Sequence, residues 1–521
     1  MRRRVAISAL AVFFLSVGRA AASCGDGVLE PTEECDEGSF NGTTWSCCLA
    51  TCLFNALSPD VIVGDITAPV RYGSTGGITA YAIGTTSCNL GTCWIKWEGG
   101  TSRHPAIGQN IFRLEDGRFE QIGQGWLKHG IAALAENVCG TCNNPGTLSR
   151  LGVNCSDPYD GTTNGLQTRL GPKGNVNPNT GDFLWPDDRL TQTGDALYKR
   201  LQVHNVDLDP ALNSGALYFV EAQYVTKDDA NAHNQMNNAS YRRVMVGPAP
   251  NFLLNPVETT QRTKAAIEAW RANDPAVMQT TVEDADGTFY IAAKATSLGG
   301  GLYHYEYAVH NFTNNRGART FTVPIPPGAT ITNVGFHDVD YHSGDPFSGD
   351  DWSPTVTSTS VRWATQTYAV NLTANALRWG TLYNFRFDAD EPPGVGTVTL
   401  GLFKPGGTAT VTGTTVVPGC LGSPGDVGDG VRVTRSAGST TIAWPVAAGS
   451  TTSSVLRGLV SQLPVGPGGG DEVCLETGIA AASTTDPQDP DPGDCFWYLV
   501  RGVNGCGTGT YGDSRQSTTC P

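Results

Sequence analysis

The amino-acid sequence predicts a mainly β protein of several modules, in which a small disulfide-rich repeat is followed by β-sandwich-like domains. Three observations lead to this prediction. The chain of 521 residues is longer than one hydrophobic core supports. Its 64 glycines and 31 prolines separate short apolar segments, as is typical of strands joined by many turns. Its 15 cysteines fall into three clusters, which mark the modules.

Residues 1–22 have the pattern of a secretory signal peptide. Residues 2–4 are arginines, residues 5–17 are apolar, and residues 20–22 are the small alanines that a signal peptidase requires. The apolar stretch is shorter than the roughly 20 residues that span a bilayer. We therefore expect cleavage near Ser23 and a secreted protein, extracellular or bound to the cell envelope, without membrane insertion.

Each cysteine cluster contains five residues. Since five is odd, either two clusters share a disulfide and one thiol remains, or three thiols remain unpaired. In the last cluster we expect Cys474 to pair with Cys495 and Cys506 to pair with Cys520, because each pair would close a loop between neighbouring strands. The clusters are Cys24, Cys35, Cys47, Cys48 and Cys52, then Cys88, Cys93, Cys139, Cys142 and Cys155, then Cys420, Cys474, Cys495, Cys506 and Cys520.

Residues 23–54 contain too little apolar sequence for a core, so disulfides must hold this segment. It contains Cys-Gly-Asp-Gly, then Glu-Glu-Cys-Asp, then Cys-Cys-x3-Cys. The pattern resembles a short cysteine-rich repeat of secreted bacterial proteins, including those of myxobacteria. Its opening is similar to the calcium loop of the disintegrin-like domains of metalloproteases.

This resemblance implies a Ca²⁺ site in the repeat. Calcium binds roughly 6–8 oxygen ligands and accepts carboxylates mixed with carbonyls on a turning loop. The alternative is an acidic, solvated loop that is held by disulfides alone. The implied ligands are the side chains of Asp26, Glu30, Glu33 and Asp36 and the carbonyls of Ser23 and Val28.

The middle of the chain is expected to contain two β-rich domains. Residues 55–255 should form one with long loops, in which 202–206 and 216–225 are the clearest strands. Residues 256–280 should form a helical linker, because 258–272 can place Ala265, Ala266, Ile267 and Trp270 on one face before Asn-Asp-Pro ends the helix. Residues 281–417 should form a β-sandwich-like domain, since strands follow one another at the spacing of such folds. The predicted strands are 289–293, 302–309, 319–325, 332–337, 383–388 and 398–403.

Residues 418–521 predict a small terminal β-sandwich. Alternating or apolar segments recur at 431–435, 440–444, 454–460 and 496–504. The pattern resembles a fibronectin type III-like module, although it contains more cysteines. The resemblance implies Trp444 and Tyr498 as core aromatics and a spacing or binding role.

All eight histidines lie in the middle region. Alternation along 302–310 places His304, Glu306 and His310 on one face of a strand and three tyrosines on the other. Residues 337–342 add two more histidines and two aspartates. Imidazoles with carboxylates are ligands of zinc, copper and non-haem iron. A strand with its polar face in water gives the same pattern.

The Cys139-Gly-Thr-Cys142 pair suggests zinc or redox chemistry. Its surroundings lack the βαβ pattern of a redox motif. The second closely spaced pair that a four-thiolate zinc site needs, Cys88-x4-Cys93, lies about fifty residues upstream. In an exported chain, disulfides are favoured.

The function that the sequence predicts is that of a secreted binding or structural protein. The formal net charge of −15 argues against nucleic acid or an anionic membrane as a partner, since both need a basic face. We expect a carbohydrate or another surface component as the ligand. The alternative is a metal-dependent extracellular enzyme, oxidative or hydrolytic, that uses the histidines. The sequence assigns no catalytic residue.

Overall fold

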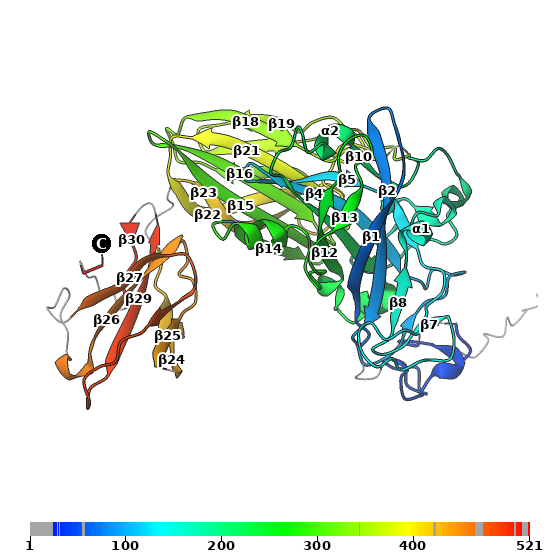
Figure 1. The fold of residues 1–521 in the computed structure, drawn as a ribbon, viewed down its shortest axis with the longest axis horizontal. Coiled ribbons are helices and arrows are strands. Elements are labelled where there is room, and N and C mark those ends of the chain that lie inside the picture. The colour runs from blue at the N-terminus through cyan, green and yellow to red at the C-terminus, as the bar shows by residue number, and fades with distance from the viewer. Residues whose placement is uncertain are drawn as a thin grey trace, which may run out of the picture.

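The computed structural model describes residues 24–28, 30, 32–54, 58–342, 344–419, 424–436, 438–463, 472–504, 507–512 and 519–520. Within these ranges the protein is mainly β, as predicted, and its strands form several separate sheets (Figure 1). The predicted signal peptide and Ser23 lie outside the described residues. In the described part, no helix has the length and apolar composition needed to cross a membrane.

An 11-stranded sheet organises the first large domain. Its main path runs β1-β2-β10-β5-β4-β11-β12-β13, and β3 pairs with β7 in a separate ribbon. The strands are β1 (Val61–Thr75), β2 (Ile78–Asn89), β3 (Ile95–Lys96), β4 (Ala106–Glu115), β5 (Arg118–Gln124), β6 (Leu127–His129), β7 (Arg150–Leu151), β8 (Ser156–Tyr159), β9 (Leu170–Gly171), β10 (Leu201–His204), β11 (Leu217–Val225), β12 (Ala239–Val246) and β13 (Leu254–Pro256). Short helices in the connections are α1 (Gly161–Asn164), α2 (Asn205–Leu208) and α3 (Lys227–Asn231).

Two five-stranded sheets form the second domain, and their facing sides share one hydrophobic core. Each of the six strands predicted between 289 and 403 overlaps a strand of this sandwich. Tyr307 and Phe385 from one sheet pack against Phe321 from the other. The sheets are β14 (Met278–Asp284), β15 (Gly287–Gly299), β16 (Leu302–Asn311), β21 (Leu382–Ala389) and β18 (Ile331–His337), and β19 (Ser353–Val356), β20 (Ser360–Ala364), β17 (Ala318–Pro324), β22 (Pro393–Leu402) and β23 (Thr410–Pro418).

The outer face of the sheet that contains β16 packs against the first domain. His310 is 1% exposed and Glu306 is 3% exposed, although both lie on the face opposite the tyrosines. Arg118 of β5 forms an ion pair with Glu306, with 3.1 Å between Nε and Oε1. A third hydrophobic cluster joins residues of both domains, Phe112 and Phe119 with Tyr290 and Leu382 among them. The two domains therefore form one continuous body.

The helix predicted over 258–272 is much shorter in the structure. Only α4 (Glu268–Asn273) forms. Glu258 and Thr263 have positive φ angles of 65° and 57°, which interrupt a helix. The backbone N–H of Ala266 donates to the Glu221 carboxylate at 2.6 Å. The predicted docking face is nevertheless buried, because Ala265, Ala266, Ile267 and Trp270 are at most 3% exposed. Tertiary contacts thus replace the first half of the predicted helix.

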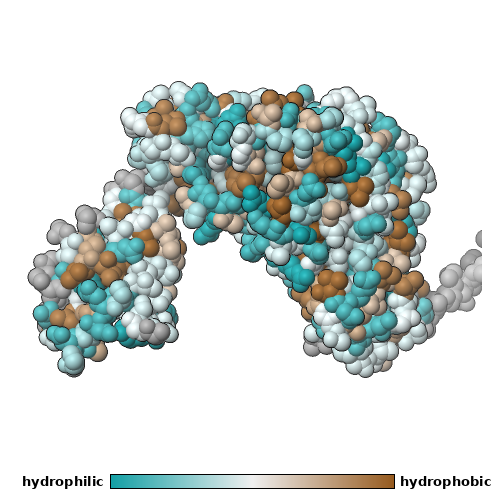
Figure 2. Space-filling model, in the orientation of Figure 1, coloured by the Kyte–Doolittle hydropathy of each residue, from teal (hydrophilic) through white to brown (hydrophobic). Residues whose placement is uncertain are grey.

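The C-terminal module contains a three-stranded and a four-stranded sheet. Trp444 is buried in its core with Ile442 and Val455, and Tyr498 packs against them. Figure 1 shows the module beside the end of the sandwich near β22 and β23, and Figure 2 shows open space between much of it and the central body. The strands are β24 (Arg432–Ser436), β25 (Ser439–Ala443), β26 (Thr452–Leu459), β27 (Val473–Ile479), β28 (Ser483–Asp486), β29 (Phe496–Asn504) and β30 (Gly507–Thr508).

The pairing predicted for the last cysteine cluster is wrong. Cys474 is bonded to Cys520, and Cys495 is an exposed free thiol. The sheet order β27-β26-β29 explains why. Cys474 lies on β27 and Cys495 directly precedes β29, so a whole strand separates them by roughly 9–10 Å. A disulfide requires Cα atoms within about 7 Å. Cys506 lies outside the described residues.

The cysteine-rich repeat is tied to the first domain by a disulfide. Two bonds lie inside the repeat, Cys24–Cys52 and Cys35–Cys48, and a third joins Cys47 to Cys93 beyond the end of β2. Two more brace the first domain, Cys88–Cys139 and Cys142–Cys155. The first two clusters therefore share one bond, which is one of the two arrangements that the odd counts allow. The Cys139 and Cys142 pair accordingly holds disulfides, as favoured.

Candidate ligand-binding groove

A groove of about 570 Å³ lies between the cysteine-rich repeat and the first domain. The Cys47–Cys93 bond holds its two sides together. Beside that bond, the backbone N–H of Trp94 donates to the carbonyl of Trp45 at 2.9 Å. The ring of Phe40 meets the ring of Trp94 edge-on, with 5.6 Å between centroids. These contacts fix the repeat against the domain and give the groove a defined shape.

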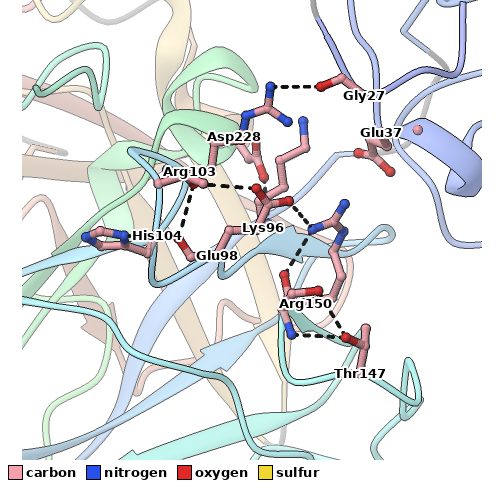
Figure 3. A network of polar contacts seen from close by, with 12 residues as sticks. Gly27, Glu37, Lys96, Glu98, Arg103, His104, Thr147, Arg150 and Asp228 are labelled. Atoms are coloured by element: carbon pink, nitrogen blue, oxygen red, sulfur yellow. Dashed lines mark hydrogen bonds and ion pairs between the residues drawn. The ribbon is translucent and has the colours of Figure 1, made fainter. Parts of the chain in front are cut away.

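Two cationic side chains line the groove without a carboxylate in ion-pair contact among the described residues. They are Lys96 at the end of β3 and Arg103 in the loop before β4. The Arg103 guanidinium donates to the carbonyl of Gly27 at 3.3 Å, so it reaches across to the repeat. Figure 3 shows the Lys96 side chain rising between this guanidinium and the Glu37 carboxylate. Both cations can therefore donate to a ligand.

Acidic groups line the same groove and supply acceptors. Glu37 accepts a hydrogen bond from the Ser46 hydroxyl at 2.7 Å, and burial raises the pKa of its carboxyl. Asp228 accepts the backbone N–H of Lys96 at 2.8 Å (Figure 3). Lys227 pairs with Asp182 at 2.7 Å on the domain side. The lining thus combines donors with acceptors, and Phe54 and Phe183 add aromatic surface.

At the groove wall, two buried histidines form a hydrogen-bonded chain, and one of them, His104, lines the groove itself. His104 Nδ1 lies 3.3 Å from the carbonyl of Glu98, and His104 Nε2 lies 3.0 Å from His129 Nδ1. The rings of Phe183 and Trp185 pack against both imidazoles. Burial lowers the pKa of His104 to about 4 and that of His129 to about 3, so both are neutral at pH 7. The chain stiffens the wall that carries Arg103.

Of the predicted calcium ligands, Asp36 has a different role in this arrangement. Its carboxylate accepts four hydrogen bonds, from the backbone of Gly25, Gly27 and Gly38 and from the Asn41 amide, at 2.7 to 3.2 Å. Burial opposes its charge, but these donors outweigh burial and lower its pKa. Asp36 therefore folds the loop, and both its oxygens are already in use.

The other predicted ligands are spread along the loop. Asp26 accepts the backbone N–H of Val28 at 2.8 Å, and Glu33 accepts that of Glu30 at 3.1 Å. Among the described residues, the group of potential ligand atoms that converges within 4.8 Å contains Glu33 with Cys24 and Cys52. Those two cysteines are bonded to each other and offer no thiolate. The donor set as arranged does not fit the full predicted shell, and calcium stays a prediction.

The histidines of β16 are held by protein groups. His304 lies 2.6 Å from Asp388 through Nδ1 and 3.2 Å from Glu306 through Nε2. These two carboxylates occupy both ring nitrogens and raise the pKa of His304, the bond to Glu306 having the larger effect. His310 is buried beside the rings of Phe112 and Phe312, and burial lowers its pKa to about 3. The predicted shared face exists, but it forms an interface between domains.

The other histidine-rich segment covers the first domain. His337 and His342 line a cavity of about 470 Å³ together with His204 of β10. His204 Nε2 lies 2.7 Å from Asp340, and the buried ring of His342 packs near Trp126 and Tyr198. In the described ranges, no three histidine or acidic ligand atoms of this cavity come within 4.8 Å of one another. The arrangement therefore offers no preformed three-ligand metal centre there.

Sequence reasoning missed the groove residues Lys96, Arg103 and Lys227. They lie far apart along the chain, on a two-residue strand, a loop and a short helix. No motif or spacing connects them. The available signal was the odd cysteine count, which allowed a bond between modules but did not specify Cys47 with Cys93.

No family model and no curated protein matches the chain. One solved structure with some likeness is the full-length major pilin RrgB from Streptococcus pneumoniae, at 10% identity and a TM-score of 0.16. The match covers 80% of this chain and spans 57% of the length of the pilin. A TM-score this low carries no argument about function.

Proposed function

We propose that the protein is an exported, disulfide-braced binding protein that holds a carbohydrate segment in the groove between the cysteine-rich repeat and the first domain. Six disulfides among the described cysteines support export, because such bonds persist in oxidising compartments. The C-terminal module, which resembles a fibronectin type III-like module, would act as a spacer.

The observation that carries the proposal is the pair Lys96 and Arg103. Both cations line a groove of about 570 Å³, and neither forms an ion pair with a carboxylate among the described residues. Sugar hydroxyls both donate and accept hydrogen bonds. The ammonium and guanidinium groups of the lining can donate to sugar oxygens, and its carboxylates can accept from sugar hydroxyls. Ligand sites in proteins typically combine a few such polar groups with aromatic rings.

The test is isothermal titration of the purified full chain with neutral β-linked hexasaccharides of glucose, xylose and N-acetylglucosamine. We expect saturable binding of at least one of them. The double variant Lys96→Ala with Arg103→Ala should weaken that binding at least about tenfold, because each charge-assisted hydrogen bond is worth about 1.5–3 kcal/mol.

The matched control is Lys264→Ala, which removes an exposed cation outside the groove. It should bind as the unchanged protein does. Absence of binding to all three oligosaccharides, or equal binding by the double variant, would refute the proposal. Circular dichroism of each variant separates a lost contact from lost folding.

A further inference from the structure

Lys173, Asn110 and Glu221 meet beside the centre of the 11-stranded sheet. Asn110 on β4 and Glu221 on β11 are directly opposite each other in the antiparallel ladder. The Asn110 side-chain amide donates to Glu221 Oε1 at 3.0 Å. Lys173 belongs to the 3₁₀ turn η3 (Lys173–Asn175), and its Nζ lies 3.2 Å from Asn110 Oδ1. An amine, a carboxamide and a carboxyl group from three elements thus lie in contact.

The two ionisable groups of this cluster, Lys173 and Glu221, are not joined by an ion pair. Among the described residues, Lys173 forms no ion pair, and its Nζ donates to three neutral oxygens, on Asn110, Gln124 and Gly380. Glu221 is 1% exposed and Asn110 is 3% exposed. Burial lowers the pKa of Lys173 to about 8 and raises that of Glu221. A neutral amine beside a protonated carboxyl is therefore an accessible state.

The carboxamide of Asn110 is also polarised. Its Oδ1 accepts a hydrogen bond from Gln121 Nε2 at 3.0 Å, in addition to the one from Lys173. Gln121 is fully buried and held in turn by the carbonyl of Gly380 at 3.2 Å. A preorganised donor on a carbonyl oxygen stabilises the negative charge that develops there when a nucleophile attacks the carbon. The Lys173 amine is already held next to this carboxamide, and such proximity lowers the barrier to its attack.

We propose that Lys173 and Asn110 become joined by an intramolecular isopeptide bond, with Glu221 as the proton carrier. The Nζ lone pair of the neutral Lys173 attacks Cγ of Asn110, and the Nζ–Cγ bond forms. The Glu221 carboxyl gives its proton to the departing Nδ2, the Cγ–Nδ2 bond breaks, and ammonia leaves. Glu221 is then reprotonated by the proton that Nζ gives up. One amine and one carboxamide thus become one amide and one ammonia, without an oxidant or a reductant.

A cavity of about 180 Å³ lies beside Lys173, and its lining includes Gln124 and Trp379. The bond would tie η3 to the centre of the sheet across 63 residues of sequence. Unlike a disulfide, it would survive reduction, and it would restrict the unfolded chain by the same loop-closure effect.

The test is mass spectrometry of the full chain after complete reduction of its disulfides. The mature protein should be lighter than its sequence by one molecule of ammonia. Proteolytic mapping should recover the peptides of Lys173 and Asn110 as one branched species. A mass equal to that of the sequence, or a branch between other residues, would overturn the proposal.

Substitutions of Lys173, Asn110 and Glu221 test the role of each residue in forming the bond. Lys173→Arg and Asn110→Ala should abolish the mass loss, and Glu221→Gln should leave the two peptides separate although the site keeps its shape. The matched controls are Lys264→Arg and Glu283→Gln, which are exposed, lie outside the cluster and should keep the bond. A branched peptide in Glu221→Gln at the level of the unchanged protein would disprove the role of Glu221. Because the unchanged protein is measured directly, misfolding of a variant leaves the main result intact.

Discussion

Cys47 of the cysteine-rich repeat is bonded to Cys93 of the first β domain, so the repeat is part of the body that it precedes. The bond lies beside the contact between Phe40 and Trp94 and above the groove that Lys96 and Arg103 line. A flexible attachment would leave no fixed groove. The disulfide and these noncovalent contacts together hold the shape of the candidate site.

Removing that bond should loosen the repeat. In the chain-entropy model, the double variant Cys47→Ser with Cys93→Ser loses about 4 kcal/mol, because the bond spans 46 residues. Hydrogen exchange should show faster exchange of the repeat amides, while the amides of β15 and β16 keep their protection. Unchanged protection of the repeat would show that noncovalent contacts hold it.

Alkylation and peptide mapping can determine the disulfide pairing of the C-terminal module. Alkylation of the native, unreduced protein should label Cys495, because its thiol is exposed. Peptide mapping should then recover Cys474 linked to Cys520. A peptide that links Cys474 to Cys495 would contradict the strand order of that sheet.

The Arg118–Glu306 ion pair should contribute to the docking of the two central domains. The Glu306 side chain is 4% exposed, and Arg118→Ala would remove one of its two charged partners, while the His304 imidazole at 3.2 Å stays. Loss of one partner of a buried pair costs about 3–5 kcal/mol, and the remaining His304 contact and the partial exposure of Arg118 both reduce this cost. Glu306→Gln should cost less, since an uncharged amide remains. Denaturant unfolding of both single variants and the double variant gives the coupling, and zero coupling would contradict the interface.

Acid should destabilise the protein through His104 and His129. Burial lowers the pKa of His104 from 6.5 to about 4, so between these values the unfolded chain binds a proton that the folded chain does not. The stabilisation is complete above pH 6.5 and is lost as the pH falls toward 4, by about 3 kcal/mol for this group. His104→Gln should flatten the dependence of unfolding free energy on pH. His233→Gln, at an exposed site, should not.

Calcium is tested by thermal melting of the full chain in millimolar calcium and in chelator. Extracellular modules bind at about 10⁻⁴–10⁻³ M, and a hundredfold excess over the dissociation constant stabilises by roughly 2.7 kcal/mol. We expect Glu33→Ala to reduce the rise in melting temperature that calcium causes. The control is Asp116→Asn, which changes an exposed acid of the first domain and should leave that rise unchanged. Equal melting in both buffers would contradict the calcium site and leave the loop to its disulfides and to the hydrogen bonds of Asp36.

The sequence by itself determined the β class and twelve of the 30 strands that the described residues form. Alternation of apolar and polar residues is local, so 302–309 and 383–388 could be assigned without knowing their neighbours, and both form. The odd cysteine clusters likewise limited the disulfides to two arrangements. The helix over 258–272 failed because its local pattern competed with the Glu221 carboxylate and with backbone angles that tertiary contacts impose.

Only the tertiary structure decided which surfaces meet. Alternation placed His304, Glu306 and His310 on one face of a strand, but water and a neighbouring domain give the same pattern there. The structure buries that face against Arg118. In the same way, Lys96 with Arg103, and Lys173 with Asn110 and Glu221, come together from distant segments. Sequence spacing contains no record of such contacts, because packing between sheets sets them.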